Sequence, residues 1–148
     1  MNSVDNAILS QLGQNSKISM IELGEQVGLS SSATHRRVKA LEAAGVIRGY
    51  RADIDPSAIG RNFEVIVSVF LAKTDPFTVA GFESAIASVD NVMSCHRLFG
   101  EPDYSILVAV ADVHEYETLW STRLSTLPGT ARVASQMTMK TIKTLTRR

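Results

Sequence analysis

Apolar residues recur at helical spacing near the start of the chain, at Val4, Ile8, Leu9 and Leu12. This spacing predicts a short helix with one buried face. Ser3 is a candidate cap, and the charge of Asp5 in the first turn suits the helix dipole. The small and polar residues from Gly13 to Ser16 predict a break after this helix.

A second helix is marked at both of its ends. Ser19-Met20-Ile21-Glu22 is a capping box, and Ile18 and Leu23 occupy the two positions of a hydrophobic staple. Leu23 and Val27 continue the buried face. Gly28 follows, and a glycine in the left-handed conformation would end the helix there.

A third helix is predicted over Ser32 to Ala44, with Ser30 or Ser31 as its cap. Its apolar stripe contains Thr34, Val38 and Leu41. The opposite side carries no carboxylate and contains Ser32, His35, Arg36 and Lys39, while Arg37 and Glu42 lie on the flanks. A helix with one buried apolar face and an exposed basic face opposite to it fits the major groove of DNA. Taken alone, it could equally be a solvated surface helix.

The last two helices, joined by a turn containing Gly28, match the helix-turn-helix pattern, although an ordinary helical hairpin has the same turn chemistry. Three observations favour a DNA-binding unit: the helix upstream, the acid-free outer face, and the segment downstream. Gly45 ends the third helix, and residues 46–54 then alternate as a strand would, where a winged helix-turn-helix places its wing. Arg48 and Arg51 would face phosphates there.

The second half of the chain predicts strands and helices after a linker at residues 55–62. A strand over 63–71 comes first, followed by a helix that Asp75-Pro76 opens and that buries Val79, Phe82, Ile86 and Val89. Two strands follow, over 92–99 and 104–111, around a turn at 100–103. A second helix is opened by a capping box at 112–115 and ended by Pro128-Gly129, and a last strand covers 131–141. This β-α-β-β-α-β order predicts a ferredoxin-like antiparallel sheet with two helices on one face. The expected fold class is therefore α+β, with a winged helix-turn-helix in residues 1–54, wing and linker over 46–62, and a ferredoxin-like sandwich in residues 63–148.

The other face of this sheet would be bare in a single copy of the chain. It carries apolar residues, namely Ile66, Phe70 and either Met137 or Met139. Because monomeric proteins rarely expose such patches, we expect a second copy of the chain to cover this face.

Composition narrows the class of protein. The hydrophobic fraction of 45% suits a core-forming chain of 148 residues, and no apolar run approaches the ~18–20 residues of a membrane span. The N-terminus lacks the basic and apolar stretches of a signal peptide. Cys95 is the only cysteine, which excludes an internal disulfide and a cysteine-based zinc site and is compatible with the cytoplasm. A buried structural thiol is expected there rather than a reactive one.

The formal net charge of zero hides an uneven distribution. Residues 31–51 hold five Lys or Arg and one Glu, a net charge of +4, whereas residues 61–135 hold five basic and nine acidic residues, a net charge of −4. The tail over 136–148 has four basic residues and no acidic one, again +4. A local basic patch on a neutral protein indicates a focused contact with nucleic acid. The basic tail indicates solubilising charge.

The sequence contains no catalytic constellation. His35, His96 and His114 lie in different predicted elements without metal-binding spacing, and there is no glycine-rich phosphate loop. No Ser, Cys or Lys has a base placed beside it. We therefore expect neither an enzyme nor a bound metal or cofactor.

Three stretches carry a family resemblance: V-D-N-A-I-L from Val4, E-L-G-E-Q-V-G-L-S from Glu22, and R-V-K-A-L-E-A-A-G-V-I-R-G-Y-R-A-D-I-D-P-S-A-I-G from Arg37. The third is long and ordered, so a chance match is improbable. The chain resembles the Lrp/AsnC family of amino-acid-responsive bacterial and archaeal transcription regulators. The resemblance implies a ligand-sensing (RAM-type) C-terminal domain, sheets that pair face to face into homodimers, and further assembly, commonly to octamers.

The resemblance also implies an effector pocket. In the family a Gly-x-x-Asp-Tyr segment between the two central strands borders this pocket at contacts between dimers, and here it is complete as Gly100-Glu101-Pro102-Asp103-Tyr104. A carboxylate there can pair with the ammonium group of a free amino acid, although a hairpin turn with a capping aspartate also explains the segment. Gln136, Met137 and Thr138 match last-strand positions near the pocket. Pro102 stiffens the turn, and Arg97 could meet a ligand carboxylate or Glu101.

The sequence thus predicts a cytoplasmic, nucleoid-associated transcription regulator that binds double-stranded DNA at an inverted repeat and senses a free amino acid or related metabolite. Base contacts are predicted for Ser32, His35, Arg36 and Lys39, and phosphate contacts for Arg37, Arg48 and Arg51. The flank position of Arg37 would also suit an ion pair. The alternative is an architectural, nucleoid-type protein of the same fold that responds little to any ligand.

Overall fold

The computed structural model describes residues 2–142, which form two compact units, one ending at Asp53 and the other running from Ile54 to Ile142. Each unit has a buried hydrophobic core of its own. The end of the basic tail, with Lys143, Arg147 and Arg148, lies outside the described residues.

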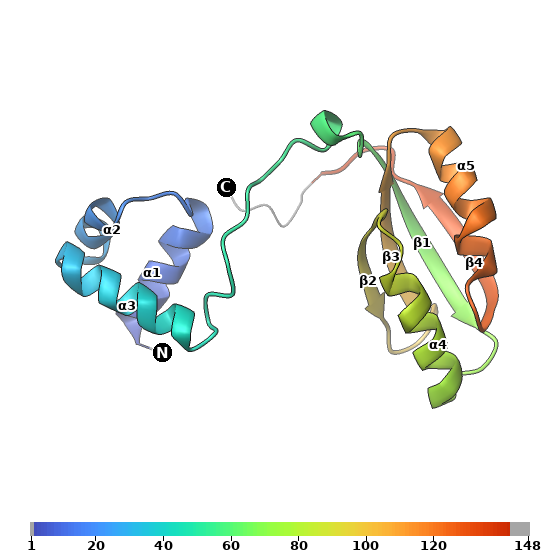
Figure 1. The fold of residues 1–148 in the computed structure, drawn as a ribbon, viewed down its shortest axis with the longest axis horizontal. Coiled ribbons are helices and arrows are strands. Elements are labelled where there is room, and N and C mark those ends of the chain that lie inside the picture. The colour runs from blue at the N-terminus through green and yellow to red at the C-terminus, as the bar shows by residue number, and fades with distance from the viewer. Residues whose placement is uncertain (1, 143–148) are drawn as a thin grey trace. The chain divides into compact units, whose positions relative to one another are not determined.

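The described part of the N-terminal unit has three helices: α1 (Ser3–Gln14), α2 (Met20–Val27) and α3 (Ser31–Ala43) (Figure 1). Their apolar faces meet in one core, made by Ile8, Leu12, Ile18, Leu23, Val38 and Leu41. The predicted stripe of α3 is confirmed, because Thr34, Val38 and Leu41 are all buried. The Thr34 hydroxyl donates to the carbonyl of Ser30 at 2.9 Å, so this buried polar group is satisfied locally.

Helix α1 begins and ends differently from the prediction. Asn2, not Ser3, is its N-cap: the Asn2 side chain accepts from the N–H of Asp5 at 2.9 Å, and the Asp5 carboxylate accepts from the N–H of Asn2 at 3.3 Å. With Asn2 as the cap, a carboxylate occupies the third helical position and closes a reciprocal box, whereas Ser3 would have placed neutral Asn6 there. The break predicted to start at Gly13 starts after Gln14, since one glycine in a helix costs only about 1 kcal/mol.

Both ends of α2 and the start of α3 have the predicted chemistry. Ser19 and Glu22 form the capping box, in which the Ser19 hydroxyl accepts from the N–H of Glu22 at 3.2 Å. Gly28 ends α2 in the left-handed conformation with a φ of 73°, and Ser30 caps α3. These bonds satisfy backbone groups that the helix ends would otherwise leave without partners.

Gly24 sets how closely α2 approaches the start of α3. A Cβ at this position would lie 2.7 Å from the carbonyl oxygen of Leu29 and 3.0 Å from the hydroxyl oxygen of Thr34. Only glycine therefore allows the two helices to pack at this distance without a backbone shift.

Replacing Ser19 by alanine should lower the free energy of unfolding of the N-terminal unit by about 1 kcal/mol, because the N–H of Glu22 loses its acceptor. Thermal unfolding followed by far-UV circular dichroism measures the change. Ser16→Ala is the matched control, since Ser16 is exposed and forms no side-chain hydrogen bond within the described residues. Equal losses in the two variants would contradict the capping role.

The segment after α3 does not form the predicted wing strands. Gly45 follows the helix in the left-handed conformation, and the N–H of Val46 donates to the carbonyl of Leu41 at 3.0 Å, which closes the helix end. Residues 46–55 are then described without a strand, so the strand predicted from their alternation is wrong. A strand needs a partner, and the chain enters a 3₁₀ turn at Pro56–Ile59 before a second strand could return.

The C-terminal unit has the predicted β-α-β-β-α-β order. Its described elements are β1 (Phe63–Leu71), α4 (Pro76–Ala87), β2 (Val92–Arg97), β3 (Tyr104–Val110), α5 (Val113–Thr122) and β4 (Thr130–Met137), with 3₁₀ turns at Pro56–Ile59 and Leu124–Thr126. The strands form one antiparallel sheet in the order β2-β3-β1-β4, and α4 and α5 cover one of its faces (Figure 1). The ferredoxin-like fold is confirmed.

The core of this unit lies between the sheet and its two helices. The strands contribute Val65, Val67 and Val69 from β1 and Tyr104, Ile106, Val108 and Val110 from β3. Phe82 of α4 is fully buried, and its ring lies 4.4 Å from that of Tyr104. The predicted buried set on this helix is confirmed, namely Val79, Phe82 and Ile86, with Val89 just beyond the helix end.

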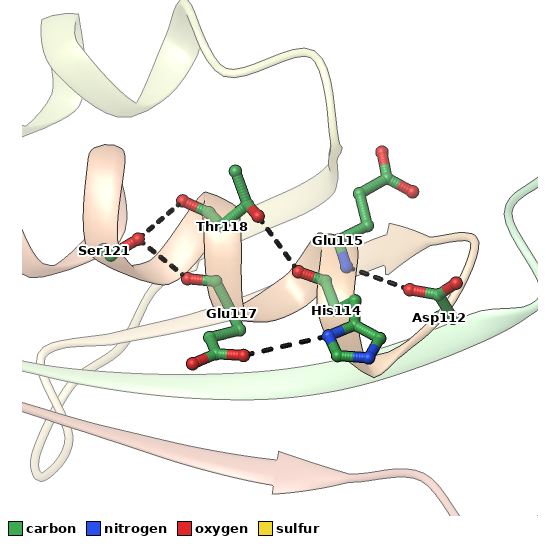
Figure 2. Close-up of polar contacts among 6 residues, drawn as sticks. All are labelled: Asp112, His114, Glu115, Glu117, Thr118 and Ser121. Atoms are coloured by element: carbon green, nitrogen blue, oxygen red, sulfur yellow. Dashed lines mark hydrogen bonds and ion pairs between the residues drawn. The ribbon is translucent and has the colours of Figure 1, made fainter.

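Helix α5 is shorter than predicted, and its cap is only half of a capping box. The Asp112 carboxylate accepts from the N–H of Glu115 at 2.9 Å (Figure 2), but the Glu115 side chain accepts from Ala111 rather than from Asp112. Hydroxyl groups further along donate to carbonyls three or four residues back: Thr118 to His114, Ser121 to Glu117 and Thr118 (Figure 2), and Thr122 to Thr118. Because such bonds compete with the helical ladder, α5 ends at Thr122 before a 3₁₀ turn instead of continuing to Leu127.

The strands end where their partners end. The prediction for β4 extends to Thr141, but the strand stops at Met137, which pairs with Val65 of β1. Because β1 begins only two residues before Val65, at Phe63, a single backbone hydrogen bond follows that pair, from the N–H of Thr138 to the carbonyl of Glu64. The strands β2 and β3 also end earlier than predicted, at Arg97 and Val110.

The face of the sheet away from the helices is open within the described residues. Ile66 is 42% exposed on this face. Met137, one of the two methionines expected here, pairs with the buried Val65 and therefore lies on the helix-covered face, so that prediction is wrong. The guanidinium of Arg132 lies 3.7 Å from the centre of the Phe70 ring and covers it only partly. An apolar surface is therefore accessible on this side of the sheet.

Candidate functional site

The outer face of α3 gathers hydrogen-bonding and cationic side chains. Ser32, His35, Arg36 and Lys39 are all exposed, opposite the buried stripe of the helix. Within residues 2–142, Arg36 forms no ion pair, so its guanidinium is available to a ligand from outside the chain. Such a face can donate hydrogen bonds to base edges and phosphates in a major groove.

Arg37 lies on the flank of α3 and contacts another helix. Its Nε is 3.0 Å from Oδ1 of Asp5 in α1, and the two side chains are 34% and 18% exposed. The Nε–H does not point at the carboxylate, so the contact is an ion pair without a directed hydrogen bond. Arg37 thus ties α3 to α1, in the ion pair that its flank position also allowed.

Lys39 and Tyr50 both hold the carboxylate of Glu42. The Lys39 Nζ lies 2.8 Å from Oε2, and the Tyr50 hydroxyl donates to Oε1 at 2.8 Å. These hydrogen bonds lower the pKa of Glu42. Because an exposed ion pair such as Lys39–Glu42 contributes little to stability, Lys39 can leave Glu42 to contact DNA. Tyr50, which sequence reasoning missed, holds the segment after α3 against that helix.

Arg48 and Arg51 lie in that segment and are exposed. The segment is anchored before Arg48, because the N–H of Ile47 donates to the carbonyl of Leu41 at 3.1 Å and Ile47 packs against the helical core. It is anchored again by Tyr50. In the part of the chain that the structure describes, neither arginine forms an ion pair. Both extend the basic surface of the N-terminal unit beyond α3.

The segment Gly100–Tyr104 connects β2 to β3. Gly100 and Glu101 are exposed and Pro102 is half-buried, whereas Asp103 already serves the fold, because its Oδ2 accepts from the N–H of Leu71 at 2.8 Å. Tyr104 is buried, and its hydroxyl donates to Oε1 of Glu83 on α4 at 2.8 Å. Burial, together with this hydrogen bond, raises the pKa of Tyr104 to about 12.

The other predicted effector residues lie in two places. Arg97 ends β2 opposite Tyr104, next to the turn. Gln136, Met137 and Thr138 lie at the far end of the sheet, where Gln136 pairs with Ile66. Ile66 and the Leu71 beside the turn are separated by most of β1, which is roughly 17 Å. Within one chain the structure brings Arg97 to the turn but leaves residues 136–138 away from it.

Models of known families match both halves of the chain. Residues 1–48 match a winged helix-turn-helix DNA-binding model, and residues 64–147 match the Lrp/AsnC ligand binding domain. The leucine-responsive regulatory protein of Haemophilus influenzae is 37% identical over 143 residues, which cover 97% of this chain and 86% of that protein. The chain belongs to the Lrp/AsnC family. It is a DNA-binding transcription regulator with a ligand-binding domain.

Further members of the Lrp/AsnC family extend this likeness. The Bkd operon transcriptional regulator of Pseudomonas aeruginosa is 34% identical, over 96% of this chain and 93% of its own length. Two similar structures are L-methionine complexes: a transcriptional regulator from Neisseria meningitidis (TM-score 0.91, 28% identity, 97% of this chain and 93% of that one) and a feast or famine regulatory protein from M. tuberculosis (TM-score 0.85, 29% identity, 97% and 95%). The Lrp/AsnC family consists of transcription regulators rather than enzymes, and these relatives give the architectural alternative no support.

Besides Tyr50, sequence reasoning also missed Glu83 on α4 of this Lrp/AsnC regulator. It is the only charged residue of α4, whose other residues are apolar, small or hydroxylated. That contrast is visible in the sequence, but only the fold shows that Glu83 meets Tyr104 across the helix and the sheet.

None of the helices within residues 2–142 is long and apolar enough to cross a membrane. In the same range, no group of three or more His, Cys, Asp or Glu is placed to hold a metal ion.

Proposed function

We propose that this regulator reads an inverted-repeat DNA site through two copies of α3 and responds to a free amino acid or a related metabolite. The observation that carries the DNA part is the basic face of the N-terminal unit, where Arg36, Arg48 and Arg51 are exposed and form no ion pair among the described residues. Ser32, His35, Arg36 and Lys39 contact base edges, and Arg48 and Arg51 contact phosphates. Arg37 contributes by holding α3 against α1.

A second copy of the chain is part of the proposal. The sheet of that copy covers the open apolar face with Ile66 and Phe70. The resulting homodimer supplies two recognition helices, which suits half-sites about one helical turn of DNA apart. We expect dimers to assemble further, with an octamer as the first candidate, and the protein to act in the cytoplasm on the nucleoid.

The proposed effector is a free amino acid, without a cofactor. Support comes from the match to a ligand binding domain and from the two structural relatives that are L-methionine complexes. Within one chain, Arg97 and residues Gly100–Asp103 form the contact surface, with the buried Tyr104 behind it, and another copy would add Gln136, Met137 and Thr138. A ligand bound between copies shifts their association only through its different affinities for the two assemblies.

Titration of the full-length protein with each of the standard amino acids tests the sensor. We expect at least one of them to raise the Tm, by an amount that corresponds to about 2.7 kcal/mol at a hundred times its Kd. The same amino acid should change the mass distribution in solution and the affinity for DNA sites that the protein selects from random-sequence duplexes. Selective DNA binding without a response to any amino acid would contradict the sensor and favour the architectural alternative.

A further inference from the structure

One hydrogen bond holds most of the segment that follows α3. The segment is fixed first at Ile47, which packs against the helical core. In the part of the chain that the structure describes, residues 48–54 form a single hydrogen bond, in which the Tyr50 hydroxyl donates to Oε1 of Glu42 at 2.8 Å. Glu42 lies in the last turn of α3, so this bond joins the segment to that helix.

The other side of the segment borders an open groove of about 940 Å³. Residues 46–53 line the groove from one side, and Leu9 with residues 12–17, at the end of α1 and before α2, line it from the other. The segment therefore has no close packing on this side. A stretch with an open groove on one side and a single hydrogen bond on the other loses its fixed position when that bond is removed.

The bond between Tyr50 and Glu42 is stronger than an ordinary surface hydrogen bond. Hydrogen bonds from Lys39 and Tyr50 lower the pKa of Glu42, so its carboxylate is ionised at neutral pH. A hydrogen bond to an ionised acceptor is roughly twice as strong as one between neutral groups. Lys39 Nζ lies 2.8 Å from Oε2, the other oxygen, so the carboxylate is oriented by two donors. Burial and the bond to Glu42 raise the pKa of Tyr50, so its hydroxyl keeps the proton that it donates.

We propose that Tyr50 and Glu42 are positioning residues for DNA binding, whose hydrogen bond holds Arg48 and Arg51 in place relative to α3 so that phosphate and base contacts form together. The proposal rests on the phosphate contacts proposed above for these two arginines, which lie on either side of Tyr50 in the sequence. An arginine on a loose segment still reaches a phosphate, but the segment must then be ordered when DNA binds, which lowers the affinity. The apparent affinity falls with the fraction of molecules in which the segment is in place.

The first test is Tyr50→Phe in the full-length protein, which removes the hydroxyl and keeps the ring. We expect binding to one selected and one random duplex to weaken roughly threefold to tenfold, because the hydrogen bond keeps the segment in place in most molecules. Fluorescence anisotropy of labelled duplexes measures both affinities. Tyr116→Phe, which removes a hydroxyl that shares a hydrogen bond with Ser135 in the C-terminal unit, is the matched control and should leave both affinities unchanged.

The acceptor is tested by rescue with a conservative variant. Glu42→Ala and Glu42→Gln both remove the charge that holds Lys39, but the glutamine keeps a carbonyl oxygen that can accept from Tyr50. The Glu42→Ala protein should therefore bind both duplexes roughly threefold or more weakly than the Glu42→Gln protein. Adding Tyr50→Phe to Glu42→Ala should cause no further loss, because the hydroxyl has already lost its acceptor. A further loss of the full size in this double variant would overturn the pairing.

A further comparison separates positioning from a direct contact between Tyr50 and DNA. In a protein that carries both Arg48→Ala and Arg51→Ala, the segment has no arginine left to place. If Tyr50 acts through the arginines, adding Tyr50→Phe should then cost little, so the effects of the substitutions are not additive. If Tyr50→Phe still weakened binding by its full factor, the hydroxyl would act on DNA or on the fold by itself, and the positioning role would be overturned.

The outcomes separate this role from the wider function. If Arg48→Ala and Arg51→Ala weaken DNA binding and Tyr50→Phe does not, the positioning role is overturned and the phosphate contacts stand. If the two arginine variants bind DNA as tightly as the wild type, the phosphate contacts are overturned, and the positioning role with them. A loss in Tyr50→Phe that disappears both with Glu42→Ala and without the two arginines supports the role.

Discussion

Replacing Phe82 by alanine should lower the free energy of unfolding of the C-terminal unit by about 3–5 kcal/mol. The Phe82 side chain is fully buried between α4 and the sheet, with its ring 4.4 Å from that of Tyr104. The strands beneath it are held in register by backbone hydrogen bonds, so they can collapse into the resulting cavity only in part. Because a whole domain is stable by only about 5–15 kcal/mol, this single change brings the unit close to unfolding.

Trp120 provides the measurement for Phe82→Ala. It is the only tryptophan, and it packs against the core of the C-terminal unit, so its fluorescence in a urea titration follows that unit alone. All variants are compared at one protein concentration, since association adds to apparent stability. Phe82→Leu, which keeps an apolar side chain of intermediate size, is the matched control and should cost less. A loss below about 1 kcal/mol for the alanine variant would contradict the role of Phe82 in the core.

Features that depend on residues close in sequence were predictable. The capping box at Ser19 and Glu22, the left-handed Gly28 and the buried stripe of α3 follow from spacing within a single turn or helix. The limits of β1 were also predictable, because the segment over 63–71 alternates one fully apolar face with one mixed face and coincides with a strand that has partners on both sides. In each case one local pattern has only one structure that satisfies it.

Features that depend on a distant partner were not predictable in the same way. Residues 46–54 alternate as a strand does, but no strand within residues 2–142 pairs with them, and the sequence alone does not show this. The end of β4 is set by where β1 begins, and the end of α5 by hydroxyl groups that compete for its carbonyls. The same limit applies to the candidate sites, since neither the contact between Glu83 and Tyr104 nor that between Arg37 and Asp5 has a local signature.

Replacing Arg36 by alanine should weaken binding to the selected DNA site by roughly 1–3 kcal/mol, which is about 5–150-fold in Kd, and should relax the preference at one base position. Arg36 is exposed at the centre of the outer face of α3, where a guanidinium can donate to a base edge.

Arg48→Ala should instead lower the affinity for selected and random DNA alike, because a phosphate contact carries no sequence information. It should also reduce the slope of log K against log salt by about 1.

Titrations on one selected and one random duplex at several salt concentrations distinguish the two roles. Arg132→Ala, on the C-terminal unit, is the control for the loss of a cation anywhere in the chain. If Arg36→Ala and Arg48→Ala lowered the affinity for both duplexes equally, the division into base and phosphate contacts would be wrong.

Arg37→Ala should behave differently again, because the partner of Arg37 is Asp5. The N-terminal unit should lose stability, while the salt slope stays closer to that of the wild type than it does in Arg48→Ala. A full phosphate-like change in the slope for Arg37→Ala would instead mean that DNA displaces Asp5 from this arginine.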